Sequence, residues 1–249
     1  MGQHWAHVAL AAASRFIIDV RLGARTLESA AQLVASVALA CRSAVGGLPL
    51  LLIDDHRPYP AAILQVFGLI RHRRRKRGRG RLKHPDLKPP PGLLVGVVKK
   101  TRDERGNLLG VTTKVLFGSR KAIVRRIRRA EVGEQINTSH IERLNGTLRG
   151  QQARLARRTR SVSRLAEALQ HSLWLWRDLY NWTRPHRTLE GRSPAMAAGL
   201  TERVWSVRDY LKHPAHVSNL QRAIWAEERK NWLTSALEAR KRKKLLPTS

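Results

Sequence analysis

The chain has 249 residues and a formal net charge of +30, from 48 Lys and Arg against 18 Asp and Glu. This charge exceeds what solubility requires, and it favours a polyanionic partner, most commonly nucleic acid. The single cysteine, Cys41, excludes a disulfide framework and a cysteine zinc site, and with neither an apolar run of about 18 residues nor a recognisable signal peptide we expect no membrane partner.

The first part of the sequence predicts an α/β order. Side chains alternate in WAHVALAA and in SRFIIDVRLG, which predicts two strands. Residues 26–44 favour a helix with Thr26 as its N-cap, and PLLLID is typical of a strand buried in the middle of a sheet. YPAAILQVFG then predicts a second helix that ends at Gly68. Strand, strand, helix, buried strand and helix are the succession found in α/β folds.

The middle of the chain changes character. Residues 71–92 form a basic, Pro-rich segment that we interpret as a surface loop without a core of its own. The next segment, 93–132, contains two β-rich runs around Arg105-Gly106-Asn107, which predict a hairpin, and then a basic connection.

Helices are predicted from there on. INTSHIERLNGTLRGQQARLARR carries Ile141, Leu144, Leu148 and Leu155 on one stripe, and SRLAEALQHSLWLWRDLYNW predicts a second amphipathic helix that Pro185 ends. The aromatic residues of that helix are interpreted mainly as core. A shorter helix is expected near 204–212. We therefore divide the chain into 2–70, 71–92, 93–132, 133–200 with the two long helices, and a basic C-terminal part, 201–249.

Two carboxylates stand out in so basic a chain. Asp54 ends the predicted buried strand, and ligands gather at the carboxyl ends of strands in α/β sheets. Glu142 lies on a predicted helix with Thr138, Asn145 and Arg149 on the same side. Oxygen ligands of this kind hold Mg²⁺, and paired divalent ions cleave phosphodiesters. The alternatives are that Asp54 and Asp55 cap a helix or form a turn, and that Glu142 forms a local ion pair with Arg143 or Arg149.

Arginines near Glu142 are candidates for contact with DNA. They form one predicted helical face: Arg143, Arg149, Arg154, Arg157 and Arg158. The run Arg73, Arg74, Arg75, Lys76 and Arg77 could follow a phosphate backbone, and it is equally compatible with a solvated loop.

Taken together, these segments resemble a known family. Asp54 followed five positions later by Tyr59, the basic insertion, the hairpin, INTSHIERLNGTLRGQQARLARRT and YNWTRPHRTLEGRSPAMAAGLTERVW are similar to the insertion-sequence transposases with a DDE catalytic domain, in the group related to insertion sequence one. The resemblance extends over roughly residues 2 to 210. It implies an RNase-H-like fold, two Mg²⁺ or Mn²⁺ ions, a homo-oligomer on transposon ends and target DNA, and a prokaryotic cytoplasm or nucleoid.

The resemblance assigns the second aspartate of the family to Asp54 and its glutamate to Glu142, both as catalytic and metal-binding residues. Asp55 matches a variable position. The first aspartate would lie on a strand upstream of GQHWAHVAL, and this strand is expected to be missing, through a misassigned start codon or a decayed gene. Asp19, the one early carboxylate on a predicted strand, matches an ordinary position of the family. Loss of a central strand would leave two unpaired edges.

These expectations predict DNA binding with weak or no strand transfer. Two other functions remain open. A truncated, non-catalytic regulator would bind DNA without metal, and a basic RNA-binding protein would share the charge but leave the Asp54 and Glu142 patterns unexplained.

Overall fold

The computed structural model describes residues 4–42, 47–71, 86–155 and 163–213. The chain divides into two compact units, residues 1–207 and 208–249. All strands and the helices up to α6 belong to the first unit, and the short helix α7 (Val207–Lys212) lies at the boundary. None of the described helices is both long and apolar enough to cross a lipid bilayer.

The chain begins with an antiparallel strand pair, as predicted. Strand β1 (Trp5–Ala11) pairs with β2 (Phe16–Gly23), with Val8 opposite Val20 and an irregularity between Ala9 and Leu10. Helix α1 (Leu27–Arg42) follows after Thr26, whose Oγ1 accepts from the Ser29 backbone N–H, as expected of a cap.

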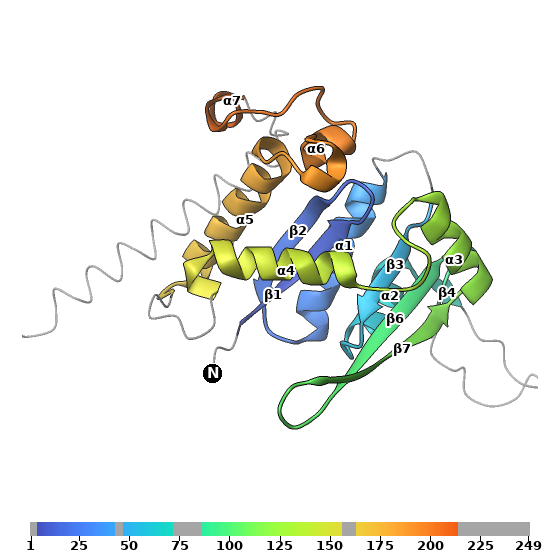
Figure 1. The fold of residues 1–249 in the computed structure, drawn as a ribbon. Coiled ribbons are helices and arrows are strands. Elements are labelled where there is room, and N and C mark those ends of the chain that lie inside the picture. Colours follow the sequence, from blue (N-terminus) through green and yellow to red (C-terminus); the bar gives the residue numbers. More distant parts are fainter. Residues whose placement is uncertain (1–3, 43–46, 72–85, 156–162, 214–249) are drawn as a thin grey trace, which may run out of the picture. The chain divides into compact units, whose positions relative to one another are not determined.

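A second sheet has the order β3-β6-β7 (Figure 1). Strand β3 (Leu50–Asp54) runs parallel to β6 (Leu94–Arg102), which pairs antiparallel with β7 (Leu108–Phe117) in the predicted hairpin. The prediction that PLLLID lies in the middle of a sheet is wrong. Among the described residues β3 pairs on one side only, and for this reason Leu50, Leu51, Leu52 and Ile53 are half-buried.

Three other expectations need correction. The segment 71–92 is not wholly a loop, because β5 (Asp86–Lys88) pairs with β4 (Leu69–Arg71) and Arg71 binds Asp86. The connection after the hairpin contains a helix, α3 (Arg120–Arg129), which begins where Ser119 Oγ accepts from the Ala122 N–H. Helix α4 (Ser139–Gln151) ends earlier than predicted, and a 3-10 turn, η2 (Ala153–Leu155), follows it.

Helices cover both faces of the second sheet. On one face, Leu50, Leu52 and Val98 pack against Ile123 and Ile127 of α3. On the other face, Leu51 and Ile53 pack against α2 (Tyr59–Phe67). Residues 50, 52 and 54 of β3 therefore share the face that α3 covers, because side chains alternate along a strand.

The first strand pair packs against α4 and α5 (Ala166–Thr183), and α4 lies across it in Figure 1. Trp176 and Tyr180 of α5 are buried in this core, as predicted. The next turns, η3 (Arg187–Leu189) and α6 (Pro194–Ala197), bury Leu189 and Ala195, so this segment has a packing role.

Amide side chains of α5 take the place of a neighbouring strand beside β2. Asn181, which is 1% exposed, accepts from the Ile17 N–H and donates to the Ile17 carbonyl, both at 2.9 Å. Gln170 likewise accepts from Leu22 N–H and donates to the Val20 carbonyl. These four bonds satisfy backbone groups that an open strand edge would leave unpaired.

Candidate metal and DNA site

Asp54 is the last residue of β3, and Asp55 and His56 follow it before α2 begins. This is the carboxyl end of a strand in a parallel pair, where α/β sheets place ligands. Asp54 raises the pKa of Tyr59, although burial of the phenol is the larger cause of that shift. Helix α2 has no side-chain cap bond at its N-terminus, so Asp54 and Asp55 do not cap it.

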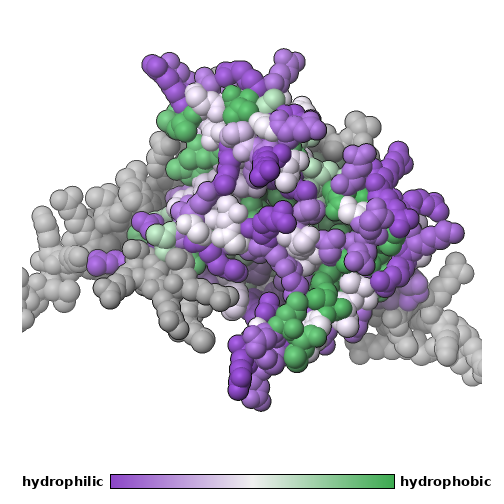
Figure 2. Space-filling view, viewed as in Figure 1, coloured by the Kyte–Doolittle hydropathy of each residue, from purple (hydrophilic) through white to green (hydrophobic). Residues whose placement is uncertain are grey.

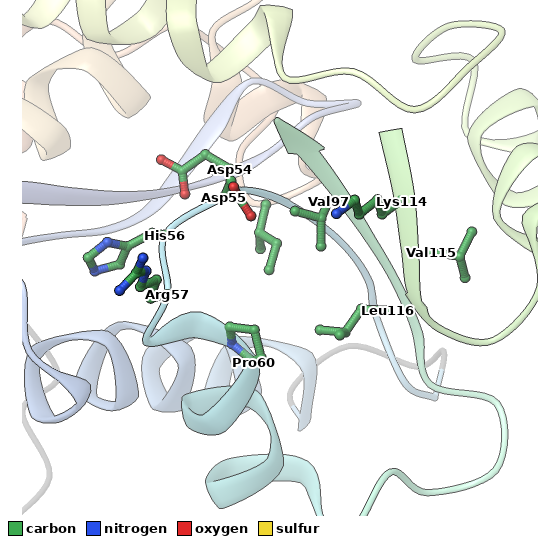
Figure 3. Close-up of a pocket in the computed structure, with 10 residues that line it drawn as sticks. Asp54, Asp55, His56, Arg57, Pro60, Val97, Lys114, Val115 and Leu116 are labelled. Carbon is green, nitrogen blue, oxygen red and sulfur yellow. The ribbon is translucent and has the colours of Figure 1, made fainter. Parts of the chain in front are cut away.

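The two aspartates point to different sides of the sheet (Figure 3). Asp55 lies on the side of Ile53, where its carboxylate is 4.0 Å from Lys99 Nζ. A shallow pocket of about 190 Å³ opens here, lined in part by Asp54, Asp55, Arg57 and Lys114. Asp54 contributes to the lining of this pocket, but strand alternation places its side chain on the side of Leu52, the face that α3 covers.

Glu142 lies in the first turn of α4 with its side chain 42% exposed. Thr138 Oγ1 donates to Glu142 Oε1 at 2.5 Å, and Lys100 of β6 forms an ion pair with Oε2. Burial alone would raise the pKa of Glu142, but the hydrogen bonds from Lys100 and Thr138 outweigh it, and the pKa is lowered. The alternative of a local ion pair with Arg143 or Arg149 is therefore wrong, since the partner is a lysine on the neighbouring sheet.

Strand register places Asp54 and Lys100, the ion-pair partner of Glu142, on the same face of the sheet. Asp54 is opposite Val98 on β6, and Lys100, the partner of Glu142, is two residues further along the same face. Gly96, two residues before Val98, makes room for the segment that leads into α4. A Cβ at Gly96 would meet Ile136 and Leu52 side-chain atoms at 3.1 Å. Close packing of Ile136 on this glycine thus positions the first turn of α4 over the sheet.

The carboxylate of Asp19, in contrast, is occupied by hydrogen bonds within the fold. Its carboxylate is buried and accepts hydrogen bonds from the Val20 N–H at 2.8 Å, Ser36 Oγ at 2.6 Å and Arg21 Nε at 2.7 Å. A weaker contact reaches Arg177 on α5 at 3.5 Å. A carboxylate held by this many donors joins β2 to α1 and α5, and it has a structural role.

The predicted DNA-contacting arginines are only partly described. Arg143 and Arg149 are exposed on α4, Arg154 is exposed on η2, and Asn145 is half-buried. A single helical face that extends from Arg143 to Arg158 is wrong, because α4 ends at Gln151. Arg157, Arg158 and the run Arg73, Arg74, Arg75, Lys76 and Arg77 lie outside the described residues.

Sequence reasoning missed a basic helix. The exposed side of α3 carries Lys121, Arg125, Arg128 and Arg129, and its apolar side is only Ile123 and Ile127 with Val124. In the surface view the area over α3 is strongly hydrophilic (Figure 2). The signal was present in RKAIVRRIRR, where isoleucines four positions apart indicate a helix, but the stretch was interpreted only as a basic connection.

The carboxylates of this site fit a hard divalent cation, although Lys100 competes with the cation for Glu142. Asp54 and Glu142 offer carboxylate oxygens on one face of the sheet, and Mg²⁺ keeps several waters, so two protein ligands can suffice. Lys100 occupies one oxygen of Glu142 and would have to yield. Within the described part of the chain, no three acidic, His or Cys side chains gather closely enough to hold a metal.

Comparison with known proteins identifies one related family. Residues 126–194, from α3 to the start of α6, match the family model described as an integrase core domain. No curated protein and no solved structure matches the chain. The matched segment contains Glu142, and it supports an integrase- or transposase-like protein, with which the mixed α/β structure is consistent.

Proposed function

We propose that this chain derives from a DDE-type insertion-sequence transposase and acts on DNA with Mg²⁺ or Mn²⁺ bound by Asp54 and Glu142. One observation carries the proposal. Glu142 reaches, through Lys100, the same sheet face that ends in Asp54, and it does so inside the segment that matches the integrase core family.

Each side chain has a distinct part in this reaction. A bound divalent cation supplies a nucleophile at neutral pH and stabilises the leaving oxygen. Asp54 and Glu142 would hold it, Thr138 orients the Glu142 carboxylate, and the lowered pKa keeps Glu142 ionised. Lys100 would move from Glu142 to a phosphate oxygen when DNA binds, because the ammonium then exchanges one anionic partner for another.

Two helices support contact with the DNA backbone. Arg143 and Arg149 extend from α4 beside Glu142, and α3 adds Lys121, Arg125 and Arg129. No described carboxylate forms an ion pair with any of these five side chains. Arginine and lysine on a helix without acidic partners are suited to phosphates, which they neutralise regardless of base sequence.

Catalysis by this chain is expected to be weak. The DDE reaction needs a third carboxylate, and Asp19 is held by Arg21, Ser36 and backbone in a structural network. The Lys100–Glu142 ion pair also favours a second candidate, a non-catalytic DNA-binding regulator, since a lysine already neutralises the carboxylate.

An apolar surface supports self-association. Leu108, Leu109 and Val111 on β7 are 50%, 67% and 49% exposed, and β7 is the edge of its sheet among the described residues. Exposed apolar edge strands pair with other chains. We therefore propose that a homo-oligomer forms on DNA through this hairpin.

The test combines binding and cleavage. Binding of a short DNA duplex is measured with EDTA and with Mn²⁺, and nicking of supercoiled plasmid is measured with Mn²⁺. We expect binding in both conditions and slow nicking that Glu142→Gln abolishes, whereas Glu104→Gln, an exposed residue of the hairpin turn, leaves it unchanged. Robust nicking by Glu142→Gln would contradict the catalytic assignment, and binding without any nicking would favour the regulator.

A further inference from the structure

A group of basic side chains surrounds Tyr180 at the end of α5. His186 contacts the Tyr180 ring edge-on, with centroids 4.9 Å apart, and the Arg184 guanidinium lies 5.7 Å from the same ring. Arg15, from the turn between β1 and β2, interacts electrostatically with Tyr180, and it is repelled by the charge of Arg143 on α4. We call Arg15, Arg143, Arg184 and His186 the Tyr180 basic cluster. The turn and the end of α5 can be followed in Figure 1.

Two buried nitrogen atoms of this cluster have no hydrogen-bond partner among the described residues. Arg184 Nη1 and His186 Nε2 are buried, and neither makes a hydrogen bond within the described part of the protein. No described carboxylate forms an ion pair with Arg15, Arg143 or Arg184. An unsatisfied buried polar group destabilises the folded protein, and more so when it is charged, so such groups call for an explanation.

The backbone of Arg15 adds a second unfavourable feature. Its φ of 59° lies in the left-handed region, which is unfavourable for a residue with a Cβ. Its guanidinium donates to the Ala12 carbonyl, which closes the turn. Burial lowers the pKa of Arg15 and the charge of Arg143 lowers it further. Burial, followed by Arg184 and Arg15, also lowers the pKa of His186. The strained backbone of Arg15, the repulsion between Arg15 and Arg143, and the unpaired nitrogens of Arg184 and His186 thus belong to one cluster.

We propose that the Tyr180 basic cluster binds a phosphate group of a DNA backbone. A phosphate oxyanion accepts several hydrogen bonds at once, and its geometry matches the guanidinium fork. It would pair Arg184 Nη1 and His186 Nε2 and neutralise the repulsion between Arg15 and Arg143. The proposal that an anion binds here depends only on the side chains of the cluster. The proposal that this anion is a phosphate of the DNA backbone rests on the proposed function.

The position of the cluster gives the phosphate a role. Arg143 is the next residue after Glu142 on α4. A backbone phosphate held here would fix one strand of DNA within about one turn of the α-helix from that carboxylate. Contacts to phosphate set the register of a bound duplex. This surface is separate from α3, whose side chains are not part of the cluster.

Inorganic phosphate tests the site without DNA. We expect phosphate to raise the melting temperature of the protein above that in chloride at equal ionic strength. The shift should be lost in Arg15→Gly and in Arg184→Gln, with affinity weakened roughly tenfold or more for each, and retained in Arg187→Gln, an exposed neighbour. Arg15→Gly should also stabilise the phosphate-free protein, because glycine adopts this φ without strain and one like charge is removed. An equal phosphate shift in all four proteins, or none in the wild type, would overturn the proposal.

A DNA duplex then identifies the source of the phosphate. We expect duplex to displace inorganic phosphate, observed by phosphorus NMR, and duplex affinity to fall in Arg184→Gln. A duplex that binds without displacing phosphate would overturn the assignment to the DNA backbone. A protein that binds phosphate but no duplex would contradict the proposed function and leave the anion site intact, so the two failures are distinguishable.

Discussion

At the scale of single residues, polar side chains bind the backbone of β2 where, among the described residues, no further strand pairs with it. Asn181 and Gln170 lie three helical turns apart on α5 and each bonds the backbone of β2 twice. Asp19 likewise connects β2 to α1 through Ser36. These groups are buried or partly buried and satisfied, so their removal leaves backbone donors and acceptors without partners.

Replacement of Asn181 by leucine tests this role. The change keeps the number and branching of the side-chain heavy atoms but leaves the Ile17 N–H and carbonyl unpaired in a buried position, and we expect the free energy of unfolding to fall by about 2–4 kcal/mol. Urea unfolding measures it, and Gln32→Leu, at an exposed amide on α1, is the matched control. A loss no larger than that of the control would show that β2 does not depend on these bonds.

At the scale of elements, the sequence predicted most helices and strands, but it did not predict the place of β3 in its sheet or the presence of α3. The LLLID run indicated a strand correctly, because its apolar composition is local information. Its position at a sheet edge depends on pairing with β6, 44 positions away, which periodicity does not report. Helix α3 was missed for a related reason, since two buried isoleucines suffice to hold it on the sheet while its charge pattern resembles a loop.

Some residues of the candidate site could likewise be predicted from the sequence, and others could not. Asp54 and Glu142 stood out because carboxylates are rare in this chain, and their residue types are visible in sequence. Lys100 could not be found, because its contact with Glu142 spans 42 positions and depends on the register of β6. Gly96 gave no signal either. Its importance comes from Ile136, which packs on it from a segment that has no regular structure.

Helix α3 provides a prediction for DNA binding. Lys121 and Arg125 are four positions apart, as are Arg125 and Arg129, so like charges repel along one side and destabilise the isolated helix. DNA would relieve this repulsion. In the triple variant Lys121→Gln, Arg125→Gln and Arg129→Gln, the slope of log affinity against log salt should decrease in magnitude by about 2–3, equally for unrelated duplex sequences.

A triple variant of equal charge is the control for α3. Lys88, Arg164 and Arg187 are exposed on three separate segments, and their replacement by glutamine removes the same net charge. If both triple variants reduce the slope equally, binding follows net charge alone and α3 is not a contact surface. Unchanged binding to anionic lipid vesicles in the α3 variant would further separate DNA contact from general cation effects.

At the scale of the whole molecule, one buried histidine, His56, and two half-buried histidines, His140 and His186, predict acid sensitivity. Burial is the largest cause that lowers the pKa of His56, His140 and His186 in the folded protein. The unfolded chain therefore takes up protons first, and stability is complete above the ordinary histidine pKa of about 6.5 and decreases as the pH falls below it. We expect the free energy of unfolding in phosphate-free buffer to decline between about pH 7.5 and pH 5.5. His186→Gln should reduce this decline, and a pH-independent value would contradict the prediction.

The account depends most on whether Asp54 and Glu142 share a divalent cation. Mn²⁺ binding, followed by electron paramagnetic resonance, measures this directly in the wild type, Asp54→Asn, Glu142→Gln and the double variant. Each single change should remove most of the affinity, and the double variant should bind no more weakly than either, because ligands of one ion are not additive. Asp103→Asn, in the hairpin turn, should bind as the wild type does. Independent, additive losses, or wild-type affinity in Asp54→Asn, would contradict a shared site.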